Sequence, residues 1–175
     1  MPTISIPAGT FDFGRRAALL DTNVLVALHD DQDNNHEQTV LVLEEESSYQ
    51  WLVTVPVIVE SCGLLGARRS ETQTYSLLLW LLDPGSNVVI MPELYYPKSL
   101  TEATQDHKNW MRRYSVDYVD ASLMKAADHL TRTCELRPHA PVFTFDTGDY
   151  FKCCRQGYLY SLFDMKTAEL LDFST

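Results

Sequence analysis

The sequence lacks any run of about 18 uncharged apolar residues, the length that a transmembrane helix needs. Its first residues, MPTISIPAGTFDFGRR, are polar and include Pro2, Pro7 and Gly9. A secretory signal peptide instead begins with basic residues and continues with an apolar stretch. We therefore expect a cytoplasmic protein that is not exported and does not enter a membrane.

Cysteine is scarce, and its spacing matches neither a metal site nor a redox motif. The four cysteines are Cys62, Cys134 and the adjacent pair Cys153 and Cys154, with no CxxC pair among them. The five histidines are also scattered, without ligand spacing. These absences argue against a disulfide scaffold and a zinc site, and they favour reduced thiols.

Basic residues are few: 14 lysines and arginines stand against 24 acidic residues, for a formal charge of -10. Broad, charge-driven binding of nucleic acid needs the opposite balance. Any chemistry on nucleic acid must therefore be local. It would depend on bound cations and on small basic clusters such as Arg68-Arg69 and Arg112-Arg113.

No repeat, low-complexity tract or Gly/Ser-rich linker divides the chain after its first 15 residues. A chain of 175 residues, 45% of them hydrophobic, suits one domain with an ordinary core. We expect an N-terminal arm over residues 1–15 and a single domain over residues 16–175.

Short apolar runs alternate with stretches of helical spacing. The runs predict strands at 17–20, 52–54, 87–91, 141–145 and 158–163. The spacing predicts helices directly after Asp21 and at about 36–46, 56–68, 71–82, 101–113 and 118–132. This alternation predicts an α/β fold of three α/β/α layers, with a mostly parallel central sheet of about five strands. In such sheets the ligand site lies beyond the carboxyl ends of the strands.

Two acidic residues directly follow predicted strands. Asp21 comes after AALL, and Asp146 comes after VFTF. Both should lie at the carboxyl edge of the sheet. Taken singly, each is also what a turn or a helix N-cap requires, so neither identifies a site by itself.

Two more acids lie on the apolar faces of predicted helices. With roughly 100° per residue, Asp120 shares a face with Leu123, and Glu60 shares a face with Val57. A buried salt bridge or a protonated carboxyl is the alternative for each. If all four acids converge, charges about 4 Å apart repel by roughly 4 kcal/mol at an effective dielectric near 20. Such a cluster needs a proton or a cation, and oxygen ligands favour Mg²⁺ or Mn²⁺.

Four segments resemble, in order, the four motifs of PIN-domain nucleases, and they are especially similar to those of VapC-type toxins. They are LLDTNVLVAL at 19–28, VPVIVESCGLL at 55–65, VDYVDASLMKAADHL at 116–130 and VFTFDTGDYF at 142–151. The resemblance covers about residues 17–165. It implies a PIN-like fold and a hydrolase that cleaves RNA phosphodiester bonds as a Mg²⁺- or Mn²⁺-dependent endoribonuclease. It also implies the toxin role in a toxin-antitoxin pair, with single-stranded or structured RNA as substrate and an antitoxin protein as partner.

The resemblance also implies roles for individual residues. The catalytic acids, which would hold one or two metal ions, are Asp21, Glu60, Asp120 and Asp146. Accessory positions fall on Asn23, Asp117, Thr144 and Asp149. For Asp117 a helix N-cap remains the alternative, and for Asp149 a turn cap.

The segment 56–82 carries more apolar residues than one core face needs, notably Tyr75, Leu78, Leu79, Trp80 and Leu82. This excess predicts a homodimer, as the family resemblance also does. Burial of these residues within one subunit is the alternative.

Other functions of acid clusters at a strand edge fit the sequence less well. An aspartyl-phosphate phosphatase requires a second aspartate two residues after the first, where this chain has Asn23. A phospho-acceptor receiver domain requires a lysine at the end of a late strand, and VFTFDTGDY contains none. Two alternatives within the resemblance stay open: a stand-alone RNA-processing nuclease and a catalytically silent, protein-binding PIN-like module.

Overall fold

A six-stranded sheet forms the centre of the molecule, in the strand order β5-β4-β3-β6-β7-β8. This computed structural model describes residues 3–6, 9–12, 16–68, 71–91, 105, 112–134, 140–154 and 160–171. The strands are β3 (Arg16–Leu20), β4 (Tyr49–Val53), β5 (Val88–Ile90), β6 (Pro141–Thr144), β7 (Ser161–Asp164) and β8 (Glu169–Leu171). The first five are mutually parallel, as the sequence predicts.

The sixth strand, β8, was not predicted from the sequence. It pairs antiparallel with β7 at the edge of the sheet, after a turn in which Ala168 has a φ of 54°. Its residues Glu169 and Leu170 are exposed, so β8 carries no buried run that a sequence pattern could reveal.

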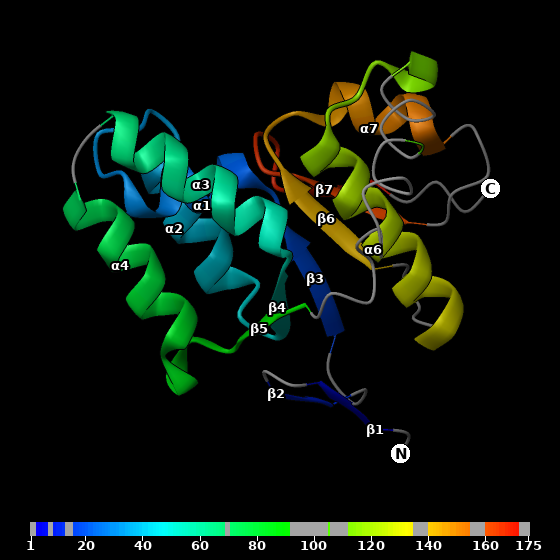
Figure 1. Cartoon of the computed structure of the whole chain (residues 1–175), viewed down its shortest axis with the longest axis horizontal. Coiled ribbons are helices and arrows are strands. Elements are labelled where there is room, and N and C mark those ends of the chain that lie inside the picture. Colours follow the sequence, from blue (N-terminus) through cyan, green and yellow to red (C-terminus); the bar gives the residue numbers. More distant parts are fainter. Residues whose placement is uncertain are drawn as a thin grey trace.

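Helices cover the sheet on two sides, which completes the predicted three-layer arrangement (Figure 1). The helices are α1 (Thr22–His29), α2 (His36–Glu45), α3 (Val55–Arg68), α4 (Glu71–Leu82), the 3-10 turn η1 (Pro84–Ser86), α6 (Tyr118–Cys134) and α7 (Thr147–Cys154). Figure 1 shows α1 to α4 on one side of β3, and α6 and α7 on the other. None of the described helices combines the length and apolar character that a membrane span requires.

Helix α7 is a second element that the sequence reading missed, because Gly148 in its first turn and its length of eight residues give a weak helical pattern. The helix predicted over 101–113 lies largely outside the described residues, and the described part holds residue 105 and a short helical turn at 112–114. In the N-terminal arm, β1 (Thr3–Ile6) and β2 (Gly9–Asp12) form an antiparallel hairpin.

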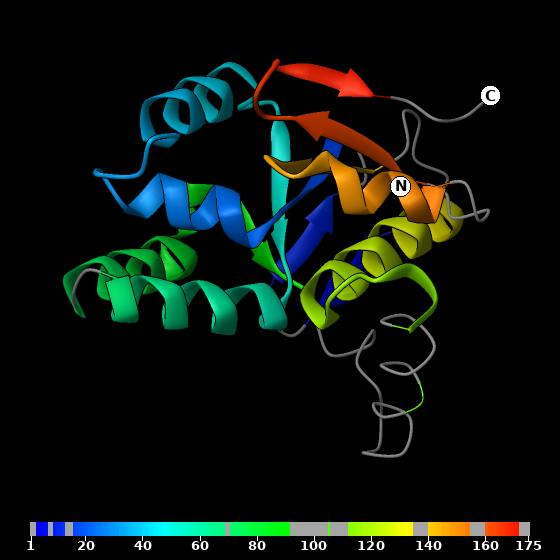
Figure 2. The ribbon, with the colours of Figure 1, turned by 90° about the horizontal axis from the view of Figure 1, so that it is seen from above.

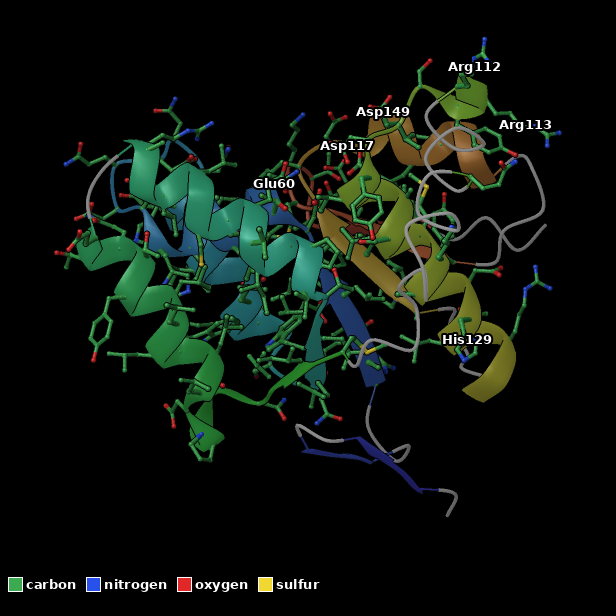
Figure 3. All side chains as sticks on the ribbon, viewed as in Figure 1. Glu60, Arg112, Arg113, Asp117, His129 and Asp149 are labelled. Atoms are coloured by element: carbon green, nitrogen blue, oxygen red, sulfur yellow. The ribbon has the colours of Figure 1, made fainter. Side chains whose placement is uncertain are left out.

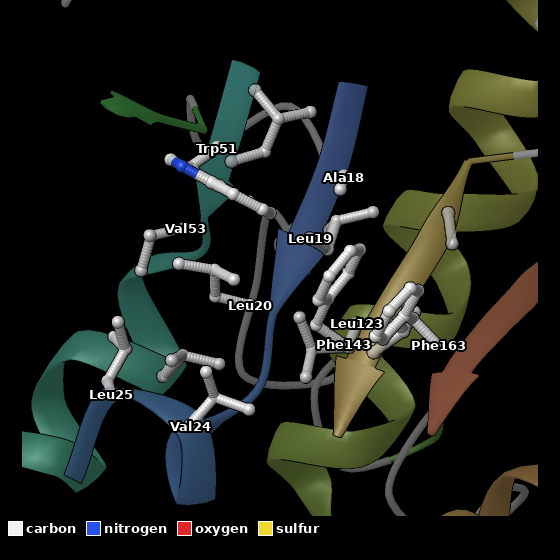
Figure 4. Packing of buried hydrophobic residues seen from close by; sticks show 14 of the residues in the cluster. Ala18, Leu19, Leu20, Val24, Leu25, Trp51, Val53, Leu123, Phe143 and Phe163 are labelled. Carbon is white, nitrogen blue, oxygen red and sulfur yellow. The ribbon is translucent and has the colours of Figure 1, made fainter. Parts of the chain in front are cut away.

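The core lies between the central strands and the helices that cover them. Every residue of β4 and β6 is buried, as parallel strands covered on both faces must be. The rings of Phe143 and Phe163 stack with their centroids 4.2 Å apart, and Trp51 packs edge-on against Phe143 at 5.1 Å (Figure 4). This packing ties β4 and β7 to β6 within the sheet.

The strand order determines where a ligand site is expected. The chain passes from β3 through β4 to β5 at one side, then returns to β6 on the opposite side of β3. The order therefore reverses between β3 and β6, and sheets of this kind bind ligands beyond the carboxyl ends of the strands at such a point. Asp21 directly follows β3, and Asp146 lies two residues after β6.

Candidate active site

Asp21 lies at the junction of β3 and α1 and is 4% exposed. Its backbone N–H donates to the carbonyl of Phe143 at 3.1 Å, which ties it to β6. Its carboxylate caps α1 by accepting the N–H of Thr22 at 2.6 Å. Asp21 is therefore the N-cap of α1, which was the alternative function for it. Its second carboxylate oxygen, Oδ2, is available to other partners.

Two residues hold Oδ2 of Asp21. The hydroxyl of Thr144, which is fully buried, donates to it at 2.6 Å, and Nδ2 of Asn23 donates at 2.8 Å. The Thr144 hydroxyl also accepts the N–H of Asp146 at 2.9 Å, while Oδ1 of Asn23 accepts the N–H of Phe145 at 3.1 Å. Two of the four predicted accessory residues, Asn23 and Thr144, therefore lie beside Asp21 and fix its orientation relative to β6.

Glu60 approaches the same junction from α3. Its Oε2 accepts a hydrogen bond of 2.6 Å from the hydroxyl of Thr22, the first residue of α1. Thr22 thus connects two of the predicted acids, through its backbone N–H to Asp21 and through its side chain to Glu60. Thr22 belongs to the string DTN at 21–23, but no feature of the sequence marks it as part of a site.

Asp120 lies in the first turn of α6, with its backbone N–H bonded to Oδ1 of Asp117 at 2.9 Å. Asp117 therefore caps the N-terminus of α6, which was the alternative role for this residue. Oδ1 of Asp120 accepts a 3.0 Å hydrogen bond from the hydroxyl of Tyr150, a fully buried residue of α7. The backbone of Tyr150 is held in turn, because its carbonyl accepts the hydroxyl of Tyr160 at 2.7 Å.

Sequence reasoning missed Tyr150. Burial raises the pKa of its phenol well above the ordinary value, and the charges of Asp21 and Asp120 add to this effect. The hydroxyl therefore stays protonated and donates to Asp120. An aromatic residue in the motif VFTFDTGDYF is typical of core packing. What could have pointed to Tyr150 is that a buried tyrosine hydroxyl usually needs a hydrogen-bond partner.

Asp146 is exposed and precedes α7, where its Oδ1 accepts the N–H of Gly148 at 3.1 Å. Asp149 lies inside the first turn of α7. Asp149 therefore lies in a helix that was not predicted, and Asp146 makes the hydrogen bond of the turn that precedes this helix.

A single open pocket of about 300 Å³ brings these residues together. Its described lining contains all four predicted catalytic acids together with Asn23, Asp117 and Asp149. Figure 3 labels Glu60, Asp117 and Asp149 on the side of the molecule where α3, α6 and α7 approach one another. Thr144 does not line the pocket, and it acts on Asp21 from beneath.

The electrostatics of the pocket indicate excess negative charge. Burial raises the pKa of Asp21 to about 6, although the hydrogen bonds from Thr144 and Thr22 act to lower it. Burial also raises the pKa of Asp120 to about 7, and the carboxylates of Asp21 and Asp117 increase the shift. The ionised cluster is thus unfavourable unless a proton or a cation compensates it.

The oxygen donors of the pocket match the preference of hard divalent cations. Within the described part of the chain, however, no three acidic, histidine or cysteine side chains stand close enough together to hold an ion as they are. Both oxygens of Asp21 and one oxygen of Glu60 accept hydrogen bonds from protein donors. The kinds of donor therefore suit a divalent metal, but the described side chains do not form a preorganised metal site.

The basic clusters differ in position. Arg68 lines the pocket, whereas Arg112 and Arg113 are exposed on the turn at 112–114 and are not part of the described lining (Figure 3). The guanidinium of Arg113 lies 5.6 Å from the ring centroid of Tyr114. Arg69 lies outside the described residues.

Comparisons with known proteins agree with this arrangement. A family model described as the PIN domain matches residues 18–152. The crystal structure of VapC20 from Mycobacterium tuberculosis, described as a sarcin-ricin loop cleaving toxin, aligns with a TM-score of 0.57 at 16% identity. The alignment covers 77% of this chain and 93% of that one, which shows a common fold.

Two further crystal structures align less well. VapBC2 from Rickettsia felis, bound to a DNA fragment from its promoter, gives a TM-score of 0.48 at 12% identity and covers 78% of this chain and 92% of that one. FitAcB from Neisseria gonorrhoeae gives 0.47 at 16% identity, with coverage of 77% and 91%. No curated protein sequence matches the chain significantly.

Proposed function

The chain belongs to the PIN domain family, and from this premise we propose that it is a metal-dependent endoribonuclease. The observation that carries the proposal is the pocket in which Asp21, Glu60, Asp120 and Asp146 meet. Two of these acids have a raised pKa, so the pocket is built to hold more negative charge than burial favours. A bound cation would offset the cost of keeping these carboxylates ionised, which supports a cation site in this pocket.

The four carboxylates would hold one or two Mg²⁺ or Mn²⁺ ions. Bound there, such ions supply a nucleophilic water at neutral pH and neutralise the charge of the phosphate. The protein's own contribution is orientation. Thr144 and Asn23 hold Asp21, and Tyr150 holds Asp120, so each carboxylate keeps one direction toward the pocket.

The proposal is tested by incubating the purified protein with single-stranded RNA in Mg²⁺, in Mn²⁺ and in EDTA. We expect cleavage with either metal, products with 5′-phosphate and 3′-hydroxyl ends, and no cleavage in EDTA. Cleavage that persists in EDTA would contradict metal dependence, and no cleavage of any RNA with either metal would contradict the nuclease.

We further propose that the nuclease is the toxin of a toxin-antitoxin pair, with an antitoxin protein as its partner. Support comes from the family and from the VapC-like order of the four motifs. A small reading frame directly upstream, whose product binds this protein and suppresses cleavage, would establish the pair. A gene without such a neighbour would favour a stand-alone RNA-processing nuclease.

The outer faces of α3 and α4 support a homodimer. Large apolar side chains are exposed there: Val59 by 66%, Tyr75 by 63%, Leu79 by 52% and Leu82 by 73%. Most of the apolar residues predicted to form the dimer interface are therefore not buried within one subunit. Trp80 is half-buried and packs against His29 with ring centroids 5.5 Å apart.

We expect light scattering at micromolar concentration to give the mass of two chains. Replacing Leu82, the most exposed of these side chains, with lysine should shift the mass toward one chain, because a charge at an apolar interface is costly to desolvate. Leu41 of α2 is 56% exposed and offers a control for the same substitution away from α3 and α4. A monomeric wild-type protein would contradict the homodimer.

A further inference from the structure

The pocket is not uniformly acidic along its length. Glu60, Leu64 and Arg68 all line it, and they follow one another at intervals of four residues along α3. Since an α-helix rises about 1.5 Å per residue, the backbone positions of Glu60 and Arg68 are roughly 12 Å apart along the axis. The pocket therefore extends along α3 away from the carboxylates and toward the helix end at Arg68.

The stretch between the acids and Arg68 is apolar. Val26 of α1 and Leu64 of α3 are the two apolar residues in the described lining. Helices α1 and α3 run side by side in the views of Figures 1 and 2, so these side chains come from neighbouring elements. Along α3 the lining thus changes from the carboxylate of Glu60 to the apolar Leu64 and then to the guanidinium of Arg68.

Arg68 is the one basic residue in the described lining, against seven carboxylates. It is exposed, and it forms no ion pair with another residue that the structure describes. Asp33 also lines the pocket, but its Oδ1 accepts the backbone N–H of Asn35 at 2.9 Å. The guanidinium of Arg68 is therefore open to an anion from outside the chain.

We propose that Arg68 binds a phosphate of the RNA strand other than the scissile one, with the intervening nucleotide lying against Val26 and Leu64. This inference rests on the proposed nuclease function of the same pocket. A phosphodiester strand carries regularly spaced charges, and the acidic end of the pocket attracts them only through bound cations. An arginine farther along supplies a planar pair of N–H donors that matches a phosphate.

The test compares Arg68→Ala with the wild-type protein for binding a fluorescent single-stranded RNA in Ca²⁺, which can replace Mg²⁺ as a ligand without supporting cleavage. We expect affinity to fall about fivefold to tenfold at low salt. The slope of log affinity against log salt should decrease by about 0.7, the value for one phosphate contact on a single strand. With Mg²⁺, KM should rise and kcat should change little.

Arg132→Ala is the matched control. Like Arg68, Arg132 is a basic residue in the last turn of its helix, so both substitutions remove a similar interaction with the helix dipole. Arg132 instead forms an ion pair of 2.9 Å with Asp128 and does not line the pocket. We expect Arg132→Ala to leave both the affinity for RNA and the salt slope unchanged.

The contacted phosphate is located by making single phosphates neutral, one at a time, as methylphosphonates in a 2′-O-methyl strand. In the wild type, one position beside the scissile one should weaken binding, and in Arg68→Ala that position alone should lose its effect. If the wild type cleaves RNA while Arg68→Ala behaves like Arg132→Ala, the inference is overturned and the nuclease stands. If the wild type neither cleaves nor binds RNA, both are overturned.

Discussion

Replacing Asp21 with asparagine should reduce metal-dependent RNA cleavage by at least about a hundredfold while the protein remains folded. Asp21 is the most constrained of the four acids, with hydrogen bonds to both carboxylate oxygens and a backbone bond to β6. The amide keeps the shape but removes the charge that a metal ligand needs. Even partners of metal ligands change activity by about 10- to 100-fold when lost, so a ligand itself should cost more. Initial rates in saturating Mg²⁺ and Mn²⁺ measure the effect.

The pH dependence of the stability of Asp21→Asn shows whether this variant has lost a metal ligand or has lost its fold. Because the pKa of Asp21 is raised to about 6 in the folded protein, its stabilising contribution is complete below the unfolded value and is lost as pH rises through about 6. Asparagine does not titrate. Thermal melting in EDTA should therefore show Asp21→Asn gaining stability relative to the wild type between about pH 4 and pH 6, with little further change at higher pH. A gap that does not change with pH would contradict the raised pKa, and equal cleavage by the two proteins would contradict the assignment of Asp21.

The position of the site could be read from sequence because burial and chain direction are encoded locally. The apolar runs before Asp21 and Asp146 predict strands, and parallel strands end at the same edge of the sheet. Asp120 could be recognised because it interrupts the apolar face of a helix whose other members are buried, such as Leu123. A charged side chain in such a place needs a reason, and the pocket supplies one.

The parts that sequence missed depend on contacts between distant segments. The bond from Thr22 to Glu60 joins residues 38 positions apart, and the bond from Tyr150 to Asp120 joins residues 30 apart. Neither threonine nor tyrosine is unusual in a helix, so no local pattern marks them. Arg68 was recognised only as part of a basic pair, because its place in the pocket follows from the packing of α3 against α1.

The hydroxyl of Thr144 offers a way to test whether the residues beneath the pocket matter for its chemistry. It joins β6 to the site by donating to Asp21 and by accepting from both Asp146 and Asn23. Thr131 of α6 is a matched control, since it is equally buried but has one such bond, accepting the N–H of Ala140 at 3.1 Å. Among the described residues it has no hydrogen bond to a pocket acid, so Thr131→Val reports the cost of losing a buried hydroxyl and its one hydrogen bond.

Thr144→Val should lower the free energy of unfolding by about 2–3 kcal/mol and the melting temperature by roughly 4–10 °C. Valine fills the same space, but it leaves the N–H of Asp146 without its acceptor and removes one of the two side-chain donors to Oδ2 of Asp21. An unsatisfied group alone costs about 1–3 kcal/mol. Thr131→Val should cost about 1 kcal/mol.

Cleavage by Thr144→Val should fall about 10- to 100-fold and Thr144→Ser should restore most of it, because serine keeps the hydroxyl that orients Asp21. Removing this hydroxyl also removes a bond that lowers the pKa of Asp21, so the rise of activity with pH should shift upward in Thr144→Val and stay in place in Thr131→Val. Denaturant unfolding and pH–rate profiles of the three variants provide the measurement. If Thr144→Val loses stability with an unchanged pH profile, Thr144 holds the sheet together but does not position Asp21.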